Sequence, residues 1–219
     1  GGTDGNIISY DASGDPVAIA TGDDGEVLTS TGAGSPPAFE AAGGGAWGYI
    51  STAPASDSAS LAFTNMVDGY DYLYTFYVLV PASNSVDLTC QLGVSGPTYR
   101  TSGYLSVVYG ISAAGTSQSG EPTTAIFMNN DATNHGLGNV EASEGARSAE
   151  LFLTNPANAS TKTAAHGMMA SINPSTLMQP TIFGSSYETA TEAHTSANFI
   201  MSSGNITSGS ILQYRRARS

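Results

Sequence analysis

The chain has 219 residues, with 18 acidic and 6 basic side chains, and charged residues make up only 11% of the sequence. Its 29 Ser, 23 Thr and 26 Gly are far from the composition of helical proteins, so an all-helical fold is excluded. A net charge of -12 argues against nucleic acid as a partner, because Lys and Arg contacts supply most of the affinity for a phosphate backbone.

The sequence also bears on membrane insertion and redox chemistry. No stretch approaches the roughly 18 to 20 apolar residues of a membrane span, so no membrane insertion is predicted. The start, Gly1-Gly2, has neither Met nor a secretion signal, as in a processed product or a part of something longer. Cys90 has no partner for an intrachain disulfide, and its alternation with Leu88 and Leu92 predicts a buried thiol.

An internal repeat opens the chain, since residues 4–20 match residues 24–40 at a shift of twenty positions. Five of the seventeen pairs are identical, mostly turn-forming residues, and three more are conservative. Each repeat is predicted to contain a short strand, a Gly-Pro turn and a second short strand.

Each repeat has too few apolar side chains for a core of its own, because a lone hairpin is marginally stable in water. We therefore expect residues 1–45 to form a β-hairpin stalk in which further repeats or identical chains bury these groups. A flexible Gly/Ser/Pro linker is the alternative. The Gly-rich segment 41–46 is the expected hinge to a second domain, residues 46–219.

The second domain shows the period-two apolar pattern of strands. Residues 70–80 have large side chains on both faces, so this strand is expected inside a sheet or beneath another subunit. The other predicted strands are 47–52, 60–66, 86–92, 104–111, 123–128, 147–154, 166–172, 196–203 and 209–214.

About ten strands without a helical period predict an all-β fold whose second domain is an antiparallel β-sandwich of jelly-roll type. The Gly-, Ser-, Thr- and Asn-rich segments 112–122, 129–146 and 173–195 are predicted to be loops, where binding surfaces are usually carried. The pattern assigns no individual binding residue.

Two motifs are similar to sequences of bacteriophage tail fibres and related virion appendage proteins. Residues 25–39 resemble the fibre unit Gly-x-Val-Leu-Thr-Ser-x-Gly-x-Gly-x-x-Pro-x-aromatic, with Phe39 where Trp is frequent. Residues 204–214 resemble the closing strand of virion β-sandwich modules, Gly-x-Ile-x-Ser-Gly-x-Ile-x-Leu-Tyr. The resemblance implies a non-enzymatic, trimeric assembly of stalk and head that decorates the particle and contacts the host surface.

Residues that could support catalysis are scattered along the chain. His135, His166 and His194 are widely spaced and form no zinc-binding pattern, so ordinary surface or hydrogen-bonded histidines are expected. Lys162 does not lie in a Ser-x-x-Lys motif, and no Gly-x-Ser-x-Gly motif occurs.

Two carboxylate pairs, Glu141 with Glu144 and Glu188 with Glu192, could in principle cleave glycosides, as in some phage tailspikes. Solvated surface acids are the simpler interpretation. Residues 129–134 offer oxygen ligands but lack the Asp-x-Asp-x-Asp-Gly order of a calcium loop. We therefore predict no catalytic residue, no metal site and no cofactor.

Tyrosine and arginine clusters suggest contacts rather than catalysis. The four tyrosines of strand 70–80 could stack on sugars, but packing between sheets or across a subunit boundary is favoured by their apolar context. They are Tyr70, Tyr72, Tyr74 and Tyr77. The C-terminal Arg215, Arg216 and Arg218 are expected either to be solvated or to bind carboxylates of a neighbouring subunit.

Taken together, the residues and the resemblance predict a structural tail-fibre protein on the surface of a virion. It would act as a homotrimer in host attachment, through non-catalytic, multivalent binding of a surface glycan or protein. Its N-terminal segment would join other virion proteins. A capsid decoration or head fibre of the same architecture is one alternative, and a polysaccharide-degrading tailspike enzyme is the other.

Overall fold

The computed structural model of the chain describes residues 5–23, 25–41, 47–95, 98–112, 115–129, 137, 145–173 and 177–218. Throughout these ranges every regular element is a strand, and the strands form antiparallel sheets. The prediction of an all-β fold is confirmed. The chain divides into two compact units, Gly1–Ala46 and Trp47–Ser219.

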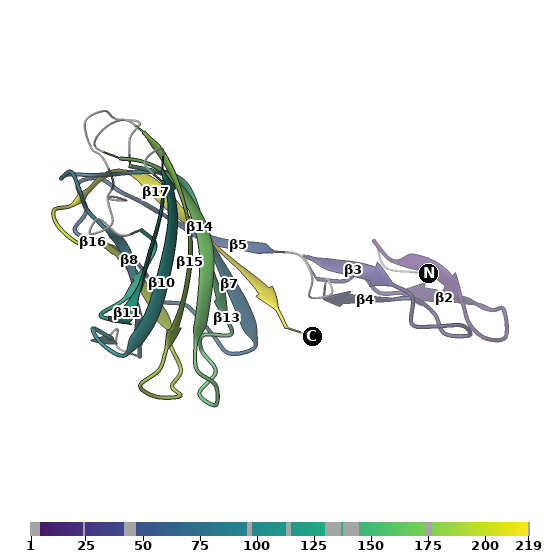
Figure 1. Cartoon of the computed structure of the whole chain (residues 1–219). Helices are drawn as coiled ribbons and strands as arrows, with labels where there is room; N and C mark the ends of the chain where they lie inside the picture. The colour runs from purple at the N-terminus through teal and green to yellow at the C-terminus, as the bar shows by residue number, and fades with distance from the viewer. Residues whose placement is uncertain are drawn as a thin grey trace. The chain divides into compact units, whose positions relative to one another are not determined.

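The first unit contains two separate pairs of short antiparallel strands (Figure 1). The pairs are β1 (Ile7–Tyr10) with β2 (Pro16–Ile19), and β3 (Glu26–Thr29) with β4 (Ala38–Ala41). A two-stranded ribbon has no second layer to cover its side chains. The apolar residues of these strands therefore remain largely exposed, with Ile8 at 73% and Tyr10 at 63%.

Glycines twenty residues apart have the same backbone conformation in the two hairpins. The φ angle is 88° at Gly5 and 90° at Gly25, and it is 84° at Gly14 and 86° at Gly34. Residues with a Cβ rarely adopt such positive values, so the turn geometry accounts for glycine at these positions.

The second unit contains a large sheet in the order β11-β10-β15-β14-β13-β7-β17-β5 (Figure 1). Its strands are β5 (Gly48–Pro54), β7 (Tyr70–Pro81), β10 (Tyr104–Ser112), β11 (Gly115–Thr123), β13 (Gly145–Thr154), β14 (Ala164–Ile172), β15 (Met178–Tyr187) and β17 (Ile206–Ala217). The expectation that strand 70–80 is internal is confirmed, because β7 lies between β13 and β17.

A smaller sheet of five strands has the order β12-β8-β16-β6, with β9 paired to β8. Its strands are β6 (Leu61–Phe63), β8 (Leu88–Val94), β9 (Thr98–Tyr99), β12 (Ile126–Phe127) and β16 (Ser196–Met201).

Side chains from both sheets form one hydrophobic core. The ring of Phe199 on β16 lies 5.0 Å from that of Tyr74 and 5.2 Å from that of Phe76, both on β7. It also contacts Phe63 on β6, at 6.1 Å. Buried aromatic contacts of this kind stabilise the packing of one sheet on the other.

Two of the predicted loops are wrong in part, because 112–122 contains most of β11 and 173–195 contains β15. β11 was not predicted because its sequence is polar and lacks an alternating apolar pattern. In β15, Pro180 and Gly184 interrupt the apolar pattern. Pro180 is tolerated because the pairing of β15 with β10 ends at Thr181, so the missing N–H is not needed on that side. Most of the third predicted loop, 129–146, lies outside the described residues.

Candidate functional site

The large sheet has a second face, turned away from the core, which we call the outer face. Strand alternation sends Tyr104 and Val108 of β10 into the core, whereas the residues between them point outward. Eight of the large apolar side chains on this face, from strands β7, β10, β14 and β15, are 40% to 69% exposed. They are Tyr77, Leu105, Val107, Tyr109, Ile111, Met168, Met178 and Ile182, and we call them the outer apolar set.

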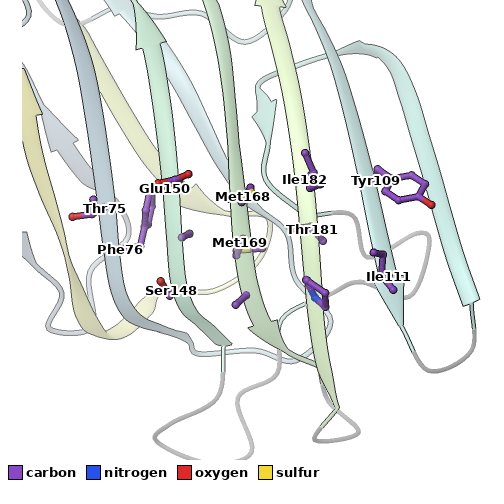
Figure 2. A pocket seen from close by; sticks show the side chains of 13 residues that line it. Thr75, Phe76, Tyr109, Ile111, Ser148, Glu150, Met168, Met169, Thr181 and Ile182 are labelled. Atoms are coloured by element: carbon purple, nitrogen blue, oxygen red, sulfur yellow. The ribbon is translucent and has the colours of Figure 1, made fainter. Parts of the chain in front are cut away.

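Strand register places side chains from five neighbouring strands in one row across this face. Tyr109 of β10 is opposite Ile182 of β15, which is opposite Met168 of β14. Met168 is opposite Glu150 of β13, and Glu150 is opposite Thr75 of β7. A groove of about 510 Å³ runs along this row, and Figure 2 shows the side chains that line it.

The groove is almost free of charge. Strands β10, β14 and β15 contain no Asp, Glu, Lys or Arg, and Glu150 is the one charged residue among those that line the groove. No histidine or cysteine is among the lining residues, so the groove has neither a nucleophile activated by an imidazole nor a set of metal ligands. Its chemistry suits the non-covalent burial of apolar surface.

The predicted histidine candidates do not come together. His166 is exposed on β14, where its ring lies 4.8 Å from that of Phe152. His194 is fully buried, its Nδ1 is 2.7 Å from the Thr163 hydroxyl, and its Nε2 is 3.3 Å from Glu192 Oε1. Burial lowers the pKa of His194, although the nearby Glu192 carboxylate acts in the opposite direction. His135 lies outside the described residues.

The carboxylates Glu188 and Glu192 are each bound by a cation. Lys162 forms an ion pair with Glu188, and the Arg100 guanidinium binds both oxygens of Glu192, with a 2.7 Å bond from Nε. These contacts lower the pKa of both carboxyls, whereas the general acid of a glycosidase needs a raised pKa. The other pair, Glu141 and Glu144, lies outside the described residues.

No group of three or more His, Cys, Asp or Glu side chains that could hold a metal ion occurs in the described part of the chain. Asn129 is buried and used for structure, since its side-chain oxygen accepts a 2.6 Å bond from Leu88 N–H and its amide donates to the carbonyl of Val86. Residues 130–134 of the predicted oxygen-rich segment lie outside the described ranges.

The tyrosines of β7 divide between the two faces of the sheet. Tyr72 and Tyr74 are fully buried, as the packing interpretation predicted, whereas Tyr77 is 69% exposed on the outer face. Cys90 is also fully buried, and desolvation raises the pKa of its thiol. The prediction of a buried thiol is therefore confirmed.

The C-terminal arginines contact groups of their own chain, an arrangement that neither interpretation of that segment predicted. Arg216 and Arg218 bind the two oxygens of buried Asp71, at 3.0 and 3.1 Å. The guanidinium of Arg215 stacks over the ring of Tyr70, 4.5 Å from its centroid. These contacts attach the end of β17 to the start of β7.

The sequence does not reveal the groove, because the groove is lined by residues of five strands whose adjacency depends on strand order. A signal was nevertheless present in strand 104–111, where large apolar residues occupy both faces. Such a strand needs cover on two sides, and the core provides only one.

The described residues contain no helix with the length and hydropathy of a membrane-crossing segment. Comparisons with protein-family models, with curated proteins and with solved structures find no match to this chain.

Proposed function

We propose that the chain is a structural protein of a phage particle, a tail fibre that acts in attachment to the host surface. In this proposal residues 1–45 form a stalk that joins other virion proteins, and residues 46–219 form the head of a homotrimer. The head binds a glycan or protein of the host surface without catalysis, and many weak contacts add up because several copies act together.

One observation carries the proposal: a single chain leaves large apolar side chains uncovered in both of its units. In the first unit these include Ile8 and Tyr10, and in the second they are the outer apolar set. Extended exposed apolar surface marks an interaction site, and symmetric association of identical chains is the commonest way to cover it.

The strand order of the second unit supports a jelly-roll description of the head. Four strands of the large sheet follow the order β5-β17-β7-β13, and four of the small sheet follow β6-β16-β8-β12. Successive strands β5, β6, β7 and β8 alternate between the two sheets, as do β16 and β17. Two sheets wound in this way from paired strands are typical of jelly rolls.

The two fibre-like motifs also fall on elements that suit the proposal. Residues 25–39 include β3 and the first half of β4, one of the two hairpins of the first unit. Residues 204–214 lead into β17, which lies inside the large sheet between β7 and β5. The positive φ angles shared by Gly5 with Gly25, and by Gly14 with Gly34, support a repeated unit in the stalk.

Two measurements test the proposal. Light scattering of the purified chain is expected to give three times the mass of the 22.3 kDa protomer, and a folded monomer at micromolar concentration would contradict it. Antibody labelling of particles is then expected to mark the tail, and chain added in excess is expected to compete with the particles for host cells. Label confined to the capsid would instead favour the head-fibre alternative.

A further inference from the structure

We propose that the outer face of the large sheet is the surface through which copies of this chain bind one another. The proposed occupant of the groove is the outer apolar set and its surroundings on a neighbouring copy. This inference rests on the proposed homo-oligomer and adds which residues hold it together.

The amount of apolar surface on this face is appropriate for a subunit interface. The eight side chains of the outer apolar set are each about half exposed. Taking about 150 Å² for a large apolar side chain, they offer on the order of 600 Å². A standard interface buries about 800 Å² per partner, including its polar rim. The outer apolar set and a small surrounding rim of polar residues would therefore make an interface of standard size.

The distribution of charge favours a second copy of the chain as the occupant of the groove. Two molecules with a net charge of -12 repel each other, and this repulsion is weakest where the surfaces that meet lack carboxylates. The three neighbouring strands β10, β15 and β14 provide such a surface, because none of them contains Asp, Glu, Lys or Arg. Glu150 is at the side of the groove formed by β13, beside this uncharged area.

Other occupants fit the same surface less well. The groove offers a basic partner one carboxylate, Glu150, and it offers an acidic partner no cation among its lining residues. Neither kind of partner could therefore form several ion pairs there. A sugar needs several polar groups to replace its hydration, but most of the outer apolar set cannot form hydrogen bonds. The outer face is therefore best covered by another uncharged, apolar surface, and each copy of the chain has such a surface.

The exposed position of Ile182 allows a direct test in the full-length chain. Ile182 lies between Tyr109 and Met168 in the row and is 55% exposed, so Ile182→Glu places a charge on the face without entering the core. Because a carboxylate buried in an apolar interface is costly, the dissociation constant of the oligomer is expected to rise about 100-fold or more. Light scattering over a dilution series measures this change.

The matched control is Val67→Glu. Val67 is 46% exposed but does not belong to the outer apolar set, so this variant carries the same added charge elsewhere. It is expected to remain an oligomer with the wild-type dissociation constant. Circular dichroism should show that both variants keep the wild-type strand content.

The rate of methionine oxidation is a second measurement, and it reports directly whether the outer face is covered. Met168 and Met178 are 54% and 52% exposed in a single chain, whereas Met66 and Met128 are buried. Dilute hydrogen peroxide followed by mass spectrometry is expected to oxidise Met168 and Met178 slowly in the wild-type oligomer, and at least tenfold faster in Ile182→Glu. Met66 and Met128 should be protected from oxidation in both the wild type and Ile182→Glu.

The outcomes separate this inference from the proposed function. If the wild-type chain is a monomer, both fail. If Ile182→Glu remains an oligomer and Met168 is oxidised equally fast in both proteins, the chain assembles through another surface, and only the present inference is overturned. Loss of assembly in Val67→Glu as well would show a general charge effect, and it would also overturn the inference.

Discussion

His194 illustrates how one buried side chain sets the pH dependence of stability. The neutral ring is enclosed between Thr163 and the Glu192–Arg100 ion pair, and burial lowers its pKa in the folded state. The unfolded chain, with an ordinary histidine pKa near 6.5, therefore binds a proton at a higher pH than the folded chain does. The stability contribution is present above about pH 6.5 and is lost as the pH falls below that value.

We therefore expect the free energy of unfolding of the wild-type chain to fall between pH 7 and pH 5. The replacement His194→Gln is expected to remove most of this slope, although it also lowers stability at pH 7. The same replacement at the exposed His166 is the control. Urea denaturation at several pH values measures the effect, and an equal slope in all three proteins would show that His194 is not its source.

The buried Tyr74 hydroxyl predicts a second effect at a single residue. It accepts a 3.0 Å hydrogen bond from Gln213 Nε2 and lies 3.2 Å from the sulfur of Met66. The variant Tyr74→Phe leaves the buried Gln213 amide without its acceptor, so we expect a loss of about 1 to 3 kcal/mol of unfolding free energy.

The control is Tyr77→Phe on the same strand, whose hydroxyl is on the exposed outer face. Its unfolding free energy should change by less than about 0.5 kcal/mol. Denaturant titrations of both variants and the wild type, at one protein concentration, make the comparison. Equal losses in the two variants would contradict the role of burial.

At the scale of elements, strands β7 and β17 are joined through an irregularity that the sequence does not reveal. Val78 has a φ angle of 44°, and Gly209 has one of 103° where the register between the strands shifts. A Cβ at Gly209 would lie 2.2 Å from the Val78 carbonyl oxygen, so a larger residue fits neither the conformation nor the space.

We expect Gly209→Ala to destabilise the chain by roughly 2 kcal/mol or more, because both backbone strain and a backbone clash oppose it. In Gly184→Ala, the nearest atom to the new Cβ is the Ala165 carbonyl oxygen at 3.9 Å, so this strand glycine should tolerate the change. Thermal unfolding followed by circular dichroism compares the two variants. Similar melting temperatures would show that the irregularity has no energetic importance.

The sequence predicts elements well where one face of a strand is apolar and the other is not. Strand 147–154 is an example, because it lies within β13. The sequence predicts strands poorly where packing against neighbours overrides local propensity. In β15, for example, Gln179, Thr181 and Phe183 are the buried residues, and Pro180 lies between the first two. Strand order is set by contacts between distant segments, so the row from Thr75 to Tyr109 could not be predicted from spacing alone.

At the scale of the whole molecule, assembly should appear as a dependence of stability on protein concentration. Association of folded chains stabilises them by mass action, so the wild-type melting temperature is expected to rise with each tenfold increase in concentration. The Ile182→Glu variant should melt at one temperature throughout the series. A wild-type melting temperature that does not change with concentration would argue against a reversible homo-oligomer.

The burial of Cys90 has a practical consequence for counting chains in such an assembly. Because its thiol is enclosed and its pKa is raised, Cys90 should react very slowly with maleimide dyes while the protein is folded. A cysteine introduced at exposed Ser13 would then carry one fluorophore per protomer. The number of photobleaching steps in single immobilised particles would give the stoichiometry of the assembly directly.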